Sequence, residues 1–191
     1  MNFMENKIFT KLVAEAKALG AFKANIIEAG DIITDRAFRG MCESNACGVY
    51  GKCWMCPPYV GEIDELMARV GKYDYALVYQ TVTELEDSFD FEGMIEAKKK
   101  SYPLAQSLRK AFDDVHFEKV LHLGAGGCGV CEVCSKRTNE PCRFPELAMP
   151  SLEAYGINVS ELAKASGMKY INGQNTVTYF GAVLFSLRDG E

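Results

Sequence analysis

Apolar residues recur at helical spacing near the start of the chain and gather into short runs farther along it. Segment 4–19 places its apolar residues on one helical face, and Gly20 follows where a helix would end. Further helices are predicted over 62–70, over 92–114 and from Asn158 or Ser160 through Ser166. Within 92–114, Pro103 either kinks the helix or opens a second segment.

Four runs rich in β-branched, aromatic and other apolar residues predict strands. They cover residues 21–29, 75–82, 120–123 and 176–187, and the acidic segment 84–91 is predicted to be a loop. Because helices separate the strands, the pattern favours an α/β fold. We expect one domain over 1–191, with a mixed, mostly parallel sheet of four to five strands flanked by helices.

Composition excludes several classes of protein. The chain has 191 residues and a formal net charge of −5, and its one dense basic run is 98–100, which we interpret as a solvated helix face. We therefore expect no nucleic-acid partner. No apolar stretch approaches the roughly 18 residues of a membrane span, and the N-terminus lacks a signal-peptide pattern, so we expect a cytoplasmic protein without a membrane partner. The oligomeric state is not predicted.

Sulfur is the unusual part of the composition. The eight cysteines fall in two clumps, and in a cytosolic protein such clumping favours metal or redox chemistry over structural disulfides. The first cysteine loop spans about 41–60 and the second about 124–146. The candidate metal ligands are Cys42, Cys47, Cys53 and Cys56 in the first loop, and Cys128, Cys131, Cys134 and Cys142 in the second.

The second loop has the more specific spacing. Cys128, Cys131 and Cys134 are each separated by two residues, the arrangement with which ferredoxin-type loops hold three irons of one [4Fe-4S] cluster. Gly127 and Gly129 are candidate cofactor-binding positions because glycine permits close backbone approach to a cluster. Zinc is the alternative, although structural zinc sites more often join two separated C-x2-C pairs.

The first loop is less diagnostic, since its spacing suits either zinc or a second cluster. The Cys56-Pro57 pair resembles the end of bacterial ferredoxin motifs, where the last cysteine serves the other cluster, so Cys56 and Cys142 are candidates to exchange sites. Cys53, beside Trp54, is either a ligand or a buried free thiol.

Three segments together resemble a family of small predicted metal-binding proteins of unknown function from anaerobic bacteria and methanogenic archaea. They are Cys47–Tyr59 (CGVYGKCWMCPPY), Gly124–Cys134 (GAGGCGVCEVC) and Pro141–Val159 (PCRFPELAMPSLEAYGINV). The resemblance implies a cysteine-bound metal, which would be iron–sulfur, in the cytoplasm of an anaerobe. It implies no particular reaction.

Other polar residues near the clumps have two interpretations each. Arg143 either donates to a cluster or an anionic partner, or pairs with a nearby glutamate. Glu153 and Tyr155 either line a small-molecule pocket or belong to a turn capped by Ser151. The histidines at 116 and 122 are interpreted as structural, and the Gly124–Gly127 run lacks the pattern of a nucleotide loop.

Three functions remain open at this point. The favoured one is an electron-transfer or redox protein that carries one or two [4Fe-4S] clusters and has a redox partner protein. The second is a zinc-stabilised binding module without a redox role. The third is an enzyme that uses an open cluster iron, which applies if Cys53 is not a ligand; no catalytic residue is assigned.

Overall fold

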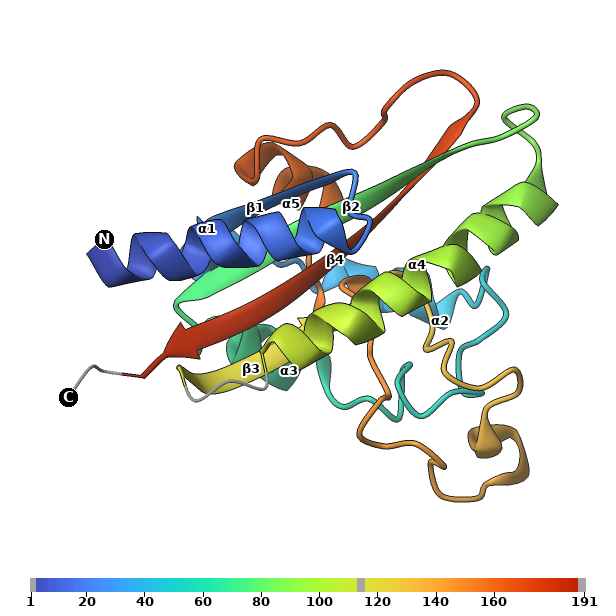
Figure 1. The fold of residues 1–191 in the computed structure, drawn as a ribbon. Coiled ribbons are helices and arrows are strands. Elements are labelled where there is room, and N and C mark those ends of the chain that lie inside the picture. The colour runs from blue at the N-terminus through green and yellow to red at the C-terminus, as the bar shows by residue number, and fades with distance from the viewer. Residues whose placement is uncertain (1–2, 113–115, 189–191) are drawn as a thin grey trace.

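A computed structural model describes residues 3–112 and 116–188, and side chains from residue 5 onward (Figure 1). Its helices and strands are α1 (Phe3–Ala18), β1 (Lys23–Glu28), α2 (Ala37–Glu43), α3 (Ile63–Val70), β2 (Tyr75–Glu84), α4 (Phe91–Ala111), β3 (Phe117–Leu123), α5 (Val159–Ala165) and β4 (Thr176–Leu187). Short 3-10 turns add η1 (Ala29–Asp31), η2 (Ser135–Thr138) and η3 (Glu153–Tyr155).

The predicted elements are confirmed in type and differ at their ends. Helix α4 continues through Pro103, so the chain does not break there, and residues 113–114 of the predicted helix lie outside the described residues. Strand β2 extends two residues beyond the predicted end and takes in Glu84. The Asn158 side chain accepts hydrogen bonds from the backbone N–H groups of Ser160 and Glu161, which confirms it as the cap of α5.

The prediction of a mostly parallel sheet is wrong. The described residues form one four-stranded sheet in the order β1-β2-β4-β3, and each neighbouring pair is antiparallel. Strands β2 and β3 do run parallel to each other, because both are antiparallel to β4, and α4 connects them as in a split β-α-β unit. The C-terminal strand β4 inserts between them and separates the parallel pair.

Helices cover both faces of the sheet (Figure 1). On one face, Leu12 of α1 and Leu108 of α4 pack against Leu77 and Phe185 of the central strands. On the other face, Leu66 of α3 and Leu162 of α5 pack against the central-strand residues whose side chains point to that face. Alternating strand residues thus reach two separate apolar clusters, which is why β2 and β4 read as nearly continuous apolar runs.

Buried polar side chains interrupt the α1/α4 face. The Tyr79 hydroxyl lies 2.8 Å from Nε2 of His122, and both residues are buried. Tyr79 stands opposite Gly181 on β4, and a Cβ atom at Gly181 would lie 2.3 Å from the Tyr79 ring. The glycine therefore lets the phenol cross β4 to reach β3, and His122 is structural, as the sequence indicated.

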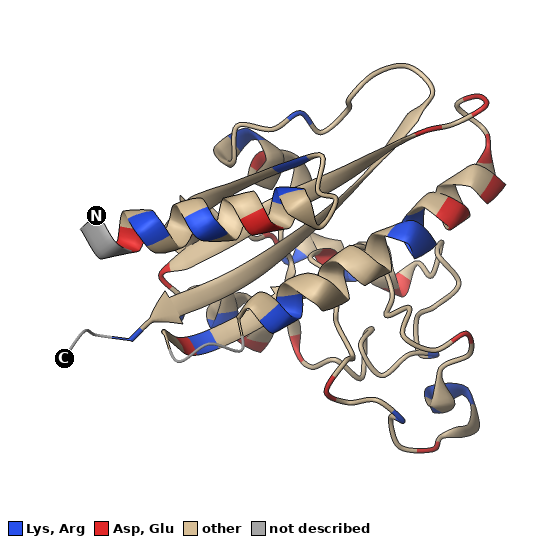
Figure 2. Ribbon diagram, viewed as in Figure 1, with Lys and Arg blue, Asp and Glu red and all other residues tan. Residues whose placement is uncertain are grey.

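Charged residues of both signs are interspersed along α1, whereas in α4 the acidic residues lie near the N-terminal end and the basic ones follow (Figure 2). Within the described part of the chain, no helix combines the length and the apolar character needed to cross a bilayer. Both cysteine loops lie at the end of the molecule away from the two termini (Figure 1).

Candidate metal centre

The two cysteine loops are held together by contacts around Trp54. Its indole N–H donates to the carbonyl of Glu140 at 2.9 Å, and its ring packs edge-on against Tyr59. The ammonium of Lys136 lies 4.4 Å from the centre of the Trp54 ring and 3.8 Å from that of Tyr59. These cation–π contacts and the hydrogen bond clamp the first loop to the second.

Five thiols from both loops surround one small cavity. They belong to Cys53, Cys128, Cys131, Cys134 and Cys142. Phe144, Ala148 and Val130 form apolar parts of the same wall. The cavity measures about 20 Å³, so the loops would have to move outward to admit a cluster. Cys53 thus lies with the second clump rather than with its neighbours in sequence.

The remaining three thiols, Cys42, Cys47 and Cys56, line a different and much larger cavity of about 610 Å³. Gly127 belongs to its wall, and a Cβ atom there would stand 3.4 Å from Sγ of Cys56. Cys56 and Cys142 do not exchange cavities, and it is Cys53 that crosses. The glycine-rich turn after β3 consequently touches the first group of thiols, while the cysteines that follow it form the second group.

Cys53 and Cys56 connect the two groups. The Cys53 thiol is within hydrogen-bonding reach of the Cys56 and Cys134 thiols. The hydrogen bond with Cys56 lowers the pKa of Cys53, and the same bond, followed by burial, raises the pKa of Cys56. Burial also raises the pKa values of Cys42 and Cys128, so in the absence of a metal these two thiols hold their protons more firmly than in water.

The thiols fit a thiolate-bound metal by their chemistry. All eight cysteines are free, so none is used in a disulfide. Within 3–112 and 116–188, no three Cys, His, Asp or Glu side chains converge tightly enough to hold a single ion as they stand. Zinc requires its sulfurs about 2.3 Å from one point, whereas the thiolates of a cubane cluster bind separate irons.

The other predicted cofactor-binding residues have structural contacts. Gly129 faces the ring of Tyr102, and a Cβ atom there would lie 1.9 Å from that ring. Arg143 donates to the carbonyl of Val133 and so braces the second loop. Tyr155 is buried, its hydroxyl accepts from Arg69 at 3.4 Å, and it lines neither of the two thiol-lined cavities. Ser151 accepts from the N–H of Ala154, as a capping residue does, while Glu153 lines the larger cavity.

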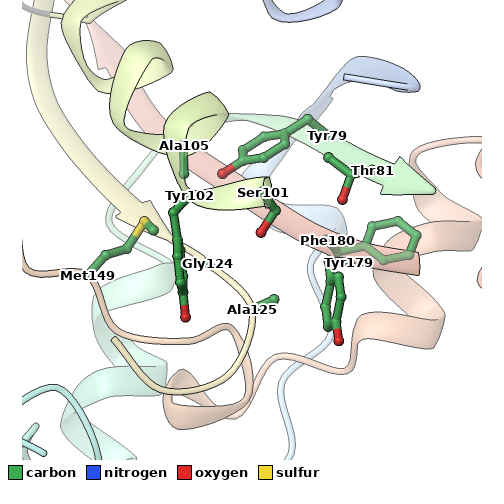
Figure 3. A pocket seen from close by; sticks show the side chains of 10 residues that line it. All are labelled: Tyr79, Thr81, Ser101, Tyr102, Ala105, Gly124, Ala125, Met149, Tyr179 and Phe180. Atoms are coloured by element: carbon green, nitrogen blue, oxygen red, sulfur yellow. The ribbon is translucent and has the colours of Figure 1, made fainter. Parts of the chain in front are cut away.

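A second small cavity lies beside the glycine-rich turn at 124–127, and Gly124 and Ala125 form part of its wall (Figure 3). It measures about 20 Å³, room for roughly one water molecule, and lies among Tyr79, Thr81 and Tyr179 of the sheet and Ser101 and Tyr102 of α4. The Tyr102 hydroxyl also donates to the Gly127 carbonyl at 3.4 Å. Helix α4 therefore sets the position of the turn that precedes Cys128.

Sequence reasoning missed Lys98. Interpreted as part of a solvated helix face, it instead lines the larger cavity together with the three thiols. The one sequence signal is helical spacing: Lys98 precedes Ser101 and Tyr102 by about one turn, which puts the three side chains on the same face of the helix.

Comparison with known proteins gives one match. A family model described as "Predicted metal-binding protein (DUF2284)" matches residues 25–185. No curated protein and no solved structure matches the chain. The matched range contains both cysteine loops and all four strands except the ends of β1 and β4.

Proposed function

The chain belongs to this family of predicted metal-binding proteins, and from that premise we propose that it carries an iron–sulfur cluster and exchanges electrons with a redox partner protein. One observation carries the proposal: five thiols from two loops surround a single cavity. Three of them have the C-x2-C-x2-C spacing that suits a [4Fe-4S] cluster.

Cys128, Cys131 and Cys134 would supply three thiolates, and either Cys142 or Cys53 the fourth. A bound cluster supplies one-electron redox chemistry at this site. Trp54, Phe144 and Ala148 line the cavity and restrict water, which affects the potential of a cluster. The fifth thiol remains as a neighbour able to hydrogen-bond a ligand sulfur.

Anaerobic metal and sulfide analysis tests the proposal. Protein purified without oxygen should contain iron and acid-labile sulfide in equal amounts, and should show an EPR signal after dithionite reduction. Replacement of Cys131 by serine should abolish that signal, whereas Cys42→Ser should leave it. Zinc without sulfide would contradict the proposal and support the zinc-stabilised module instead.

A second function, an enzyme with an open metal, rests on the group of Cys42, Cys47 and Cys56. Three protein ligands leave a coordination position free, as in catalytic zinc sites, and here they face a large cavity. The Cys53→Ser variant distinguishes an open site from a closed one. Unchanged metal content at the first group would favour the open site, and its loss would assign Cys53 as the fourth ligand there.

A further inference from the structure

The large cavity has the dimensions and lining of a small-molecule site. Its volume of about 610 Å³ lies within the range of about 300–1,000 Å³ typical of ligand pockets. Val49, Tyr50 and Val159 contribute apolar wall, while the three thiols occupy another part of it. The volume greatly exceeds the space that a single metal ion needs.

Lys98 brings a positive charge to this cavity. Its Nζ atom lies 2.6 Å from the position of a Cβ atom built on Gly126, whose φ is +63°. A side chain at Gly126 would therefore displace the ammonium. Among the described residues, the Lys98 ammonium has no hydrogen bond or ion pair.

Glu153 brings a negative charge to the same cavity. Its Oε2 atom is buried and has no hydrogen-bond partner within the described chain. Two other polar groups of the wall are occupied: Asn158 caps α5, and Ser151 accepts from Ala154. Because no donor of the described chain pairs with the Glu153 side chain, the carboxylate that lines the cavity is left to a cationic group of a ligand.

We propose that this cavity binds a small organic molecule of the amino-acid class. Its acid group pairs with Lys98, its ammonium group donates to Glu153, and its apolar body packs against Val49 and Val159. Two opposite charges that face one apolar cavity without pairing with each other match a ligand that carries both charges. The proposal does not depend on which metal the thiols hold.

Calorimetric titration of the anaerobically purified protein tests this with three probes. L-phenylalanine carries both charges, hydrocinnamate lacks the ammonium, and phenethylamine lacks the carboxylate. L-phenylalanine should bind most tightly. Lys98→Gln should weaken L-phenylalanine and hydrocinnamate by about tenfold or more and leave phenethylamine unchanged, because it removes one charged hydrogen bond. Glu153→Gln should weaken L-phenylalanine and phenethylamine and spare hydrocinnamate.

Lys100→Gln is the matched control, since Lys100 lies on α4 and is exposed, outside the cavity. It should leave the affinities for all three probes unchanged. No binding of any probe at millimolar concentration, or an equal loss for all probes in both variants, would overturn the proposal. So would a Lys98→Gln variant that loses metal and keeps its probe affinities, because Lys98 would then serve only to balance thiolate charge. Failure of the iron–sulfur proposal appears separately, as a preparation without sulfide.

Discussion

Two glycines leave space for side chains that matter to the fold and to the thiol groups. The missing side chain of Gly181 leaves the space in which Tyr79 reaches His122, and the missing side chain of Gly127 leaves the space beside Cys56. A Cβ atom at Gly181 would stand too close to the Tyr79 ring, whereas one at Gly127 would lie in van der Waals contact with Cys56 and slightly tighter against Val49, at 3.3 Å. Gly181 is therefore the position that is sensitive to the smallest substitution.

Gly181→Ala should destabilise the fold. The new Cβ would lie 2.3 Å from the Tyr79 ring, so the ring must move and its hydrogen bond to His122 must break. We expect a loss of about 2–3 kcal/mol in the free energy of unfolding, typical of overpacking combined with an unpaired buried group. Urea denaturation measures it.

Gly40→Ala is the control for this substitution. Gly40 lies in α2 and has open space around its Cβ position, so alanine should be neutral or stabilise the helix by up to about 1 kcal/mol. Equal stability of the Gly181→Ala variant and the wild type would show that Tyr79 does not depend on the space above Gly181.

His122 should make the fold sensitive to acid. Burial, with a smaller contribution from Arg109, lowers the pKa of His122 to about 3. Below the usual histidine pKa of about 6.5, His122 binds a proton in the unfolded chain but not in the folded chain. Its contribution to stability is therefore complete above that pH and falls as the pH approaches 3. At about pH 5 the loss from this residue should be about 2 kcal/mol.

Comparison of wild type with His122→Gln isolates this effect from the acid sensitivity of the thiols. The free energy of unfolding of each protein is measured at about pH 7 and about pH 5. The wild type should lose more stability between the two conditions than the variant. Identical losses would mean that another group carries the acid dependence.

At the scale of elements, the two cysteine loops form one unit because Trp54 joins them. The indole hydrogen bond to Glu140 and the Lys136 contact connect segments that are more than 80 positions apart in the sequence. Helix α4 adds a second support through Tyr102, which touches Gly129 and Gly127. The cavity with five thiols therefore depends on both loops at once.

Trp54→Ala should loosen the metal centre while leaving the sheet intact. Loss of the hydrogen bond and the cation–π contact removes about 1–2 kcal/mol of loop–loop interaction. We expect metal transfer to an excess of chelator to become about tenfold faster, with little change in the urea midpoint. Trp54→Phe, which retains a ring and loses the N–H, should give an intermediate rate. A wild-type rate in the alanine variant would contradict the clamp.

The sequence predicted elements better than their arrangement. Strand 176–187 and the Asn158 cap are local patterns, and both are confirmed. The sheet order is not local: alternating helices and strands favour parallel neighbours, and nothing in that pattern shows that β4 inserts between β2 and β3.

The candidate site was predictable in the same limited way. Cysteine spacing identified both loops, but it grouped Cys53 with Cys56, three residues away. A turn between them, in which the Cys56 N–H donates to the Cys53 carbonyl, directs the two side chains to different cavities. Lys98 stood in a run of three lysines, and only the path of α4 past the glycine-rich turn separates it from its solvated neighbours.

For the whole molecule, the apolar clusters of the sheet and the thiol-lined cavities share only Val159 among the residues that the structure describes. Neither apolar cluster of the sheet contains a cysteine, whereas the walls of the two thiol-lined cavities come mainly from the loops. The scaffold is thus stabilised mainly by burial of apolar side chains from four strands and their helices.

Metal removal should therefore affect one end of the molecule. After chelation, hydrogen exchange should accelerate in segments 41–60 and 124–146, while β2 and β4 remain protected. Mass-spectrometric exchange on the metal-loaded and the chelated protein measures this difference. Loss of protection throughout the sheet would show that the metal is required for folding, as in small zinc modules.

The strand order leaves β1 and β3 as the two outer strands, whose free backbone groups are able to pair with another chain. Charged residues stand on both: Lys23 and Glu28 at the ends of β1, and Glu118 and Lys119 near the start of β3. A register irregularity between Phe117 and Lys119 also interrupts the regular ladder of β3. Charges and irregularities of this kind discourage unwanted strand addition, so the scaffold is protected against aggregation through its sheet edges.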